Sequence, residues 1–121
     1  MALGKHDAYM VKGDRKETEM ILVSGDMPSE NLRIQLISDG EPETLDNIQR
    51  AKLHLYMWES KVYERILQVD DEEDGIVYYE WRRKDTRIEP GRYKMKVKAK
   101  FNDKSEKTFP NQDSMIMRVE E

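Results

Sequence analysis

The chain has 121 residues, which suits one domain, because a half-length unit would barely bury a core of its own. Its 21 basic and 25 acidic residues give a formal net charge of -4, which disfavours general electrostatic binding to nucleic acid or to a membrane surface. The absence of cysteine excludes disulfides and thiolate metal sites, and no apolar run reaches the roughly 18 residues of a membrane span, so we expect no membrane insertion.

The chain begins with residues rich in glycine and charge. Residues 1–16 contain Gly4, Gly13 and several charged side chains, and they predict a flexible N-terminal arm ahead of a single domain over residues 17–121. Tyr9 to Val11 could pair as an edge strand. Glu19 to Val23 is a weak strand candidate within the domain.

Apolar residues that alternate with polar ones predict strands at Leu32 to Leu36 and Ala51 to Met57, and Ile76 to Trp81 is rich in strand-forming residues. Within the last segment, the alternation assigns Val77, Tyr79 and Trp81 to the core side. A helix is the alternative over residues 45–69, where six apolar residues follow a helical spacing, but period two over 51–57 favours strands. A turn at Glu59-Ser60 or Ser60-Lys61 would then connect two strands.

The clearest pattern runs from Tyr93 to Phe101. Apolar side chains alternate strictly with lysines, which is typical of a half-buried strand. The lysines are Lys94, Lys96, Lys98 and Lys100. Met115 to Val119 is another weak strand. About seven short strands without a strong crossover helix predict an all-β fold, an antiparallel immunoglobulin-like β-sandwich.

No catalytic constellation stands out. The only histidines are His6, in the N-terminal arm, and His54, on the polar side of a strand, and no Gly-x-Ser-x-Gly turn accompanies them. The six glycines are too widely spaced to form a phosphate-binding loop. We therefore expect a protein that is not an enzyme and that uses no cofactor.

Two charged segments invite binding hypotheses. Asp70 to Gly75 matches the first positions of an EF-hand loop but has Trp81 where the bidentate Glu belongs, so a solvated hairpin tip is favoured over a calcium site. The lysine ladder, with Arg82 to Lys84 nearby in sequence, could form a nucleic-acid stripe, but a solvated sheet face is favoured and no nucleic-acid partner is expected.

Aromatic residues supply the candidate interaction surface. Tyr56, Trp58, Tyr78, Tyr79 and Trp81 could build a platform for sugar rings, although rings of this kind more often belong to the core and its rim. Because Tyr79 and Trp81 are assigned to the core side, Tyr56, Trp58 and Tyr78 remain as the candidate surface.

Several segments follow one another in the order found in a known family. They are Gly25 to Leu36, Asp39 to Pro42 with Leu45, Ala51 to Met57, Gly75 to Trp81, Asp85-Thr86, Pro90 to Tyr93 and Thr108 to Asn111. In this order and spacing, the chain from Met20 to Glu121 resembles the N-terminal domain of phage baseplate upper proteins. Each motif alone is a weak strand or turn signal, and the succession is moderately specific.

The resemblance implies a β-sandwich module of a tailed phage or prophage that docks other parts to the tail tip without catalysis. The expected partners are other phage tail or baseplate proteins, the expected location is the virion after synthesis in the host cytoplasm, and a homo-oligomer is compatible with both. Members of this family usually continue beyond this module, whereas the sequence here ends at Glu121. The alternative is a module that binds carbohydrate on the host surface and so aids adsorption, through exposed aromatic rings.

Overall fold

The computed structural model describes residues 4–121, which form strands and a single short 3-10 helix. The strands are β1 (His6–Lys12), β2 (Arg15–Glu17), β3 (Glu19–Val23), β4 (Leu32–Ser38), β5 (Glu41–Pro42), β6 (Ile48–Met57), β7 (Ser60–Asp71), β8 (Ile76–Tyr79), β9 (Gly91–Phe101), β10 (Glu106–Phe109) and β11 (Met115–Glu120). The helix, η1, spans Arg83–Arg87. The prediction of an all-β fold is confirmed.

The alternation in β9 gives the register that the sequence predicted. The apolar side chains from Tyr93 to Phe101 are all buried, with Met95 and Val97 completely so, whereas Lys94 and Lys98 are exposed. Lys96 and Lys100 are half-buried. A pleated strand sends successive side chains to opposite faces, so one face of β9 supplies the core and the other carries the ammonium groups.

Residues 45–69, the segment with the helical spacing, form the hairpin of β6 and β7. Ala51, Leu53 and Leu55 are buried, while Ile66 is 64% exposed, so the period of two decided the structure and the helical spacing was coincidental. The turn lies at Trp58 and Glu59, before the positions that the sequence suggested.

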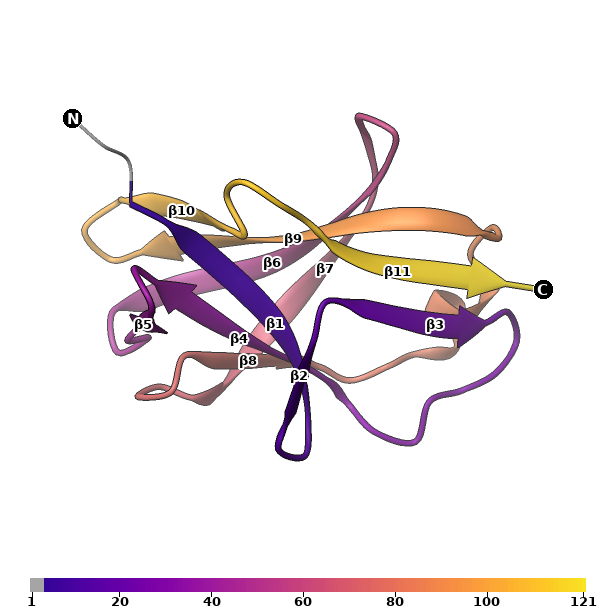
Figure 1. The fold of residues 1–121 in the computed structure, drawn as a ribbon, viewed down its shortest axis with the longest axis horizontal. Helices are drawn as coiled ribbons and strands as arrows, with labels where there is room; N and C mark the ends of the chain where they lie inside the picture. The colour runs from indigo at the N-terminus through magenta and orange to yellow at the C-terminus, as the bar shows by residue number, and fades with distance from the viewer. Residues whose placement is uncertain (1–3) are drawn as a thin grey trace.

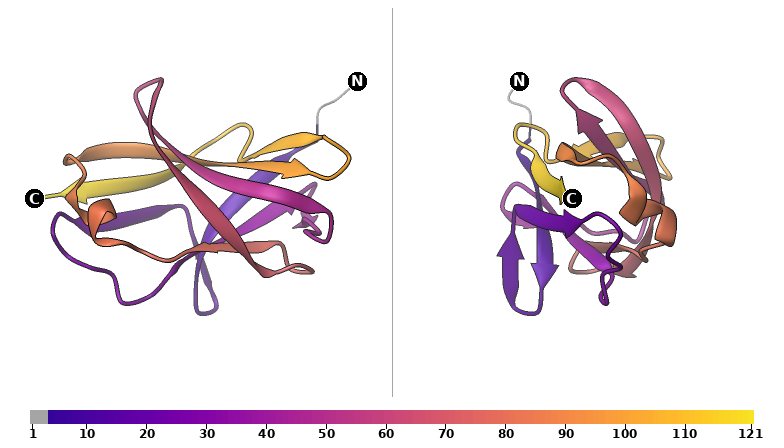
Figure 2. Two further views of the ribbon diagram at one scale, coloured as in Figure 1. Left: turned by 180° about the vertical axis from the view of Figure 1, so that it is seen from behind. Right: turned by 90° about the vertical axis from the view of Figure 1, so that its right-hand side faces the viewer.

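The strands form one continuous sheet that curls around a shared core (Figure 1). The order is β2-β1-β4-β8-β7-β6-β9-β11-β3, with β5 beside β4 and β10 beside β9. Viewed end-on, the violet N-terminal strands lie on one side of the core and the pink and orange strands on the other (Figure 2). The long strand β7 connects the two sides, because residues 60–67 pair with β6 and residues 68–71 pair with β8.

This arrangement differs from an antiparallel sandwich of about seven strands. The sheet is 11-stranded, nearly closed and mixed, because β3 pairs with β11 in parallel. Both arrows point the same way in Figure 1. Because β7 pairs with β6 and with β8, both sides of the core belong to one hydrogen-bonded sheet. A sandwich would instead consist of two separate sheets, each with two edge strands.

The N-terminal segment is part of the fold, in contrast to the predicted flexible arm. β1 pairs with β4 along five residues, and Ala8 and Met10 are each only 3% exposed. The His6 ring also stacks on Phe109, with centroids 4.9 Å apart. The sequence pattern did not predict that this segment joins the sheet, because its apolar residues alternate over only a few positions. Residues 1–3 of the predicted arm lie outside the described part of the chain.

Within residues 4–121, no helix is long and apolar enough to cross a membrane.

Candidate interaction face

The outer side of β6 and β9 carries a group of basic side chains, which we call the lysine face. It consists of Arg50, Lys52, Lys94, Lys96, Lys98 and Lys100. The two strands are antiparallel neighbours, and their register places Arg50 opposite Lys100 and Lys52 opposite Lys98. Cross-strand neighbours lie about 5 Å apart and alternate residues along a strand about 7 Å apart, so the cations form a grid and not a single row.

The core determines this placement. Ala51, Leu53 and Leu55 of β6 point inward, as do their partners Ala99, Val97 and Met95 on β9. The intervening residues must therefore point outward on both strands. On β6 these include Lys52, His54 and Tyr56, so the strand pairing assembles the face from two segments, β6 and β9, that are distant in the sequence.

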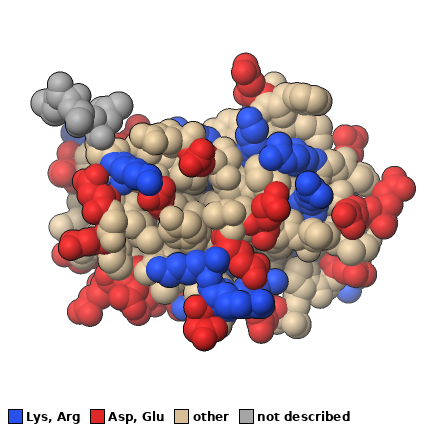
Figure 3. All heavy atoms as spheres, viewed as in Figure 1, with Lys and Arg blue, Asp and Glu red and all other residues tan. Residues whose placement is uncertain are grey.

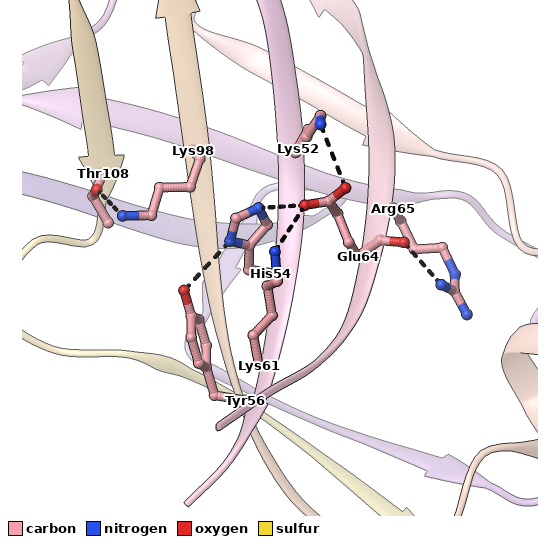
Figure 4. Close-up of polar contacts among 8 residues, drawn as sticks. All are labelled: Lys52, His54, Tyr56, Lys61, Glu64, Arg65, Lys98 and Thr108. Atoms are coloured by element: carbon pink, nitrogen blue, oxygen red, sulfur yellow. Dashed lines mark hydrogen bonds and ion pairs between the residues drawn. The ribbon is translucent and has the colours of Figure 1, made fainter. Parts of the chain in front are cut away.

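Glu64 of β7 lies beside the basic groups of β6 (Figure 4), and Glu106 of β10 is the cross-strand neighbour of Lys100. Oε2 of Glu64 lies 3.4 Å from Nζ of Lys52, and its Oε1 lies 3.2 Å from Nζ of Lys61 and 3.1 Å from Nε2 of His54. The hydrogen bonds from Lys61 and Lys52 lower the pKa of Glu64, and the bond from Lys61 has the largest effect. The carboxylate is thus shared between two lysines and neutralises only the side of the face nearest β7. Arg65, the next residue, points to the other side of β7 (Figure 4).

His54 is the titratable group closest to Glu64. Its side chain is only 12% exposed, and Nδ1 lies 3.3 Å from the hydroxyl of Tyr56. Burial lowers the pKa of His54, and the positive charge of Lys61 lowers it further, which together outweigh the carboxylate of Glu64. His54 is therefore neutral at pH 7, and it adds no charge to the face.

The lysines of β9 lack acidic partners. Across the described residues 4–121, none of Lys94, Lys96, Lys98 and Lys100 forms an ion pair, and Lys98 instead donates a 2.8 Å hydrogen bond to the hydroxyl of Thr108. The pKa of Lys96 is lowered by burial and then by the like charges of Lys98 and Lys94, against a smaller effect of Asp113. The lysines of β9 are thus not held in ion pairs, although Glu106 lies opposite Lys100, Glu59 lines the same hollow as Lys94, and Asp113 acts on Lys96.

Other parts of the surface are mixed in charge. On the face drawn in Figure 3, Lys and Arg side chains lie among Asp and Glu side chains. Intermixing is what the near balance of 21 basic and 25 acidic residues predicts. The chain has a net charge of -4, so the lysine face holds more positive charge than the composition alone predicts for a surface of this protein.

Two hollows divide the lysine face. One, of about 470 Å³, is lined by Arg50, Lys52, His54, Glu64, Lys98, Ala99, Lys100, Glu106 and Thr108. The second, of about 560 Å³, is lined by Lys94, Lys96 and Lys98 together with Tyr56, Trp58, Glu59, Thr108, Asn111, Gln112 and Ser114. The second hollow therefore combines cations with aromatic rings.

The three candidate aromatic residues do not share one surface. Tyr56 and Trp58 line the same hollow of the lysine face, whereas Tyr78 of β8 lines a different one with Ile66, Gln68 and Trp81. β7 separates β6 from β8 in the sheet, which accounts for the division. Tyr79 is buried, as predicted, and Trp81 lies beyond the end of β8, half-buried against the core.

Trp58 is the most exposed large apolar residue of the described chain, at 85%. It occupies the first position of a two-residue hairpin loop with a φ of +57°, in the left-handed region. Such loops favour glycine at a position with positive φ, because a side chain there costs about 1 kcal/mol or more. Neither packing within the chain nor backbone preference explains a tryptophan at this position.

The acidic hairpin has structural contacts of its own. Asp70 pairs with Arg33 at 2.9 Å, and Oδ1 of Asp71 accepts a 2.9 Å hydrogen bond from the backbone of Asp74. Gly75 has a φ of +68° and no room for a Cβ, which would lie 2.5 Å from the backbone oxygen of Glu43. In the described part of the chain, no group of three or more His, Asp or Glu residues is arranged to hold a metal ion.

Asp85 forms a buried polar cluster that the sequence did not identify. The carboxylate is 4% exposed and accepts hydrogen bonds from Nε of Arg65, from the Tyr79 hydroxyl at 2.7 Å and from the backbone of Arg82 at 2.7 Å. Burial and the hydrogen bond to Asp85 raise the pKa of Tyr79 to about 12. The cluster ties η1 to β7 and β8, and its satisfied hydrogen bonds indicate a structural role.

No family model matches the chain. The search of curated proteins likewise finds no match.

Proposed function

We propose that the protein is a non-enzymatic structural module of a phage or prophage tail or baseplate, which makes protein–protein contacts in the virion or during its assembly. The ordered strand and turn motifs from Met20 to Glu121 support the phage assignment through their resemblance to baseplate upper proteins. The all-β fold is compatible with it. We also propose that the fold is a variant of the immunoglobulin-like sandwich, because strands lie on both sides of one core, with β7 continuing from one side to the other.

The single observation that carries the docking role is the environment of Trp58. An 85% exposed tryptophan on a left-handed backbone costs free energy twice, through strain and through apolar surface in water. Burial against a partner would recover the second cost, and tryptophan is among the residues that most often dominate binding at protein interfaces. Tyr56 in the same hollow would extend the contact.

Tyr78 belongs to this proposal as a second and separate contact. It is half-buried in β8, and its hollow contains the exposed Ile66. A ring beside an exposed aliphatic side chain is a suitable anchor for a partner, but it acts independently of Trp58 because it lines another hollow.

Carbohydrate binding is the second candidate, and one observation favours it. Tyr56 and Trp58 share a hollow with polar groups from Thr108, Asn111 and Gln112, and two rings with a polar rim can hold the face of a sugar. Calorimetric titration with host cell-wall polysaccharide separates the two functions. Docking predicts affinity no better than about millimolar, and micromolar affinity abolished by Trp58→Gly would replace docking by adsorption.

The docking function is tested in the phage that encodes the chain. Trp58→Gly removes the ring at a position where glycine suits the backbone, so the fold should keep its stability or gain up to about 1 kcal/mol. We expect fewer complete tails in electron micrographs of this mutant. Met27→Ala is the matched control, because Met27 is also exposed but lies in the loop before β4. Normal tails with Trp58→Gly would refute the role of Trp58.

A further inference from the structure

We propose that the lysine face docks an acidic surface of a folded partner protein, with Lys94, Lys96 and Lys98 as its principal contacts. This inference rests on the proposed docking function and names the chemistry of the partner. The carboxylates of the partner would occupy the hollows in front of β6 and β9.

The first argument is charge complementarity. The ammonium groups of β9 have no carboxylate partner within residues 4–121, and Glu64 is engaged by Lys52 and Lys61 at the other strands. Burial lowers the pKa of Lys96, and the like charges of Lys98 and Lys94 lower it further, so the face carries some repulsion that an incoming anion would relieve. Opposed charges of this kind raise the association rate and suppress wrong partners.

The second argument concerns the shape of the charge distribution. Lys98 is opposite Lys52, and Lys100 is opposite Arg50, so the cations extend both along β9 and across to β6. The surface of a folded protein can present carboxylates in two dimensions, and it can bury Trp58 at the end of the same face.

The distribution of aromatic residues argues against single-stranded nucleic acid. Sites for it interleave rings with cations, so that successive bases stack while the backbone follows the charge. Here Tyr56 and Trp58 lie at one end of the face, and the positions across from Lys98 and Lys100 are occupied by Lys52 and Arg50. Trp81 packs against the core instead. Beyond Lys94, bases bound along β9 would meet the ring of His54 opposite Lys96, but its side chain is only 12% exposed.

The partner is unidentified, so the probe is poly-L-glutamate, compared with an oligodeoxythymidine of equal charge in about 50 mM salt. We expect NMR titration to shift the amides of β6 and β9 with poly-L-glutamate. Lys94→Gln/Lys96→Gln/Lys98→Gln should weaken this binding by about tenfold or more. Lys12→Gln/Arg15→Gln/Lys16→Gln removes the same charge from the exposed β1–β2 hairpin and should change the affinity by less than about twofold.

Three results would overturn the proposal. They are equal weakening by both triple variants, no binding of poly-L-glutamate to the unaltered chain, and binding of the oligodeoxythymidine about tenfold tighter than that of poly-L-glutamate, which would make the face a nucleic-acid site. Failure of this proposal can be distinguished from failure of the proposed function, because the titration and the tail experiment measure different properties. Carboxylate binding by the lysine face together with normal tails for Trp58→Gly would retain the acidic partner and reject the role of Trp58 in the tail.

Discussion

Nε2 of His54 lies 3.1 Å from Oε1 of Glu64, and the pKa of the histidine is nevertheless lowered. The reason is that burial, followed by the charge of Lys61, penalises the imidazolium more than Glu64 stabilises it. The contact lacks the geometry of a hydrogen bond, because Nε2 is buried and has no hydrogen-bond partner among the described residues, while Nδ1 lies 3.3 Å from the Tyr56 hydroxyl. Glu64 thereby remains available to Lys52 and Lys61.

This geometry predicts that His54 titrates below its ordinary pKa of 6.5. Stability should then fall as the pH drops from 6.5 towards the folded pKa, because the unfolded chain binds the proton more readily. NMR titration of the ring measures the pKa directly, and His54→Gln should make the melting temperature less dependent on pH in this range. A midpoint at or above 6.5 would show that Glu64 dominates.

The register of β9 predicts opposite outcomes for neighbouring residues. Val97 is fully buried, so Val97→Lys places an ammonium group in the core and should unfold the domain. Lys96→Glu changes a charge on the outer side and should alter the free energy of unfolding by less than about 0.5 kcal/mol. Thermal melts that rank the two variants in the reverse order would contradict the register.

The Asp85 cluster predicts a large loss of stability when its carboxylate is removed. Asp85→Ala leaves the half-buried guanidinium of Arg65 without its partner, which should cost about 3–5 kcal/mol. Tyr79→Phe removes only one hydrogen bond to the carboxylate and should cost about 1.5–3 kcal/mol. Urea denaturation of both variants provides the comparison, and a smaller loss for Asp85→Ala than for Tyr79→Phe would contradict the structural role.

Local alternation predicted the strands well, because it records which side of a strand faces the core. Tyr93 to Phe101 and Ala51 to Leu55 kept their predicted sides. The pairing of β6 with β9, which assembles the lysine face, could not be predicted, since side-chain periodicity carries no information about distant neighbours. The turn at Trp58 was missed because neither Trp58 nor Glu59 is a usual turn residue.

The same limit applies to the ends of the sheet and to the buried cluster. β1 looked like a mobile segment because few apolar residues mark it, yet Ala8 and Met10 are buried through pairing with β4. Asp85 entered the sequence analysis only as part of the Asp85-Thr86 motif, and its buried cluster could not be predicted because its partners Arg65 and Tyr79 come from other strands. Tyr56 and Trp58 line one hollow and Tyr78 lines another, because β7 lies between β6 and β8, and the sequence pattern carried no information about that separation.

The acidic hairpin predicts indifference to calcium. Asp70 is engaged by Arg33, and Asp71 accepts a backbone hydrogen bond, so the carboxylates already have partners. Millimolar calcium should leave the melting temperature almost unchanged, because a ligand stabilises only the native sites that it occupies. A rise of several degrees that disappears in Asp70→Asn/Asp74→Asn would instead establish a cation site.

We propose above all that the outer side of β6 and β9 docks a protein partner in a phage tail. The most direct test is an electron cryomicroscopy map of tails purified from the phage that encodes the chain. We expect density for this fold, with Trp58 and the β9 lysines buried against an acidic surface of a neighbouring protein. Tails that lack the fold, or that contain it with Trp58 and these lysines exposed to solvent, would contradict the claim.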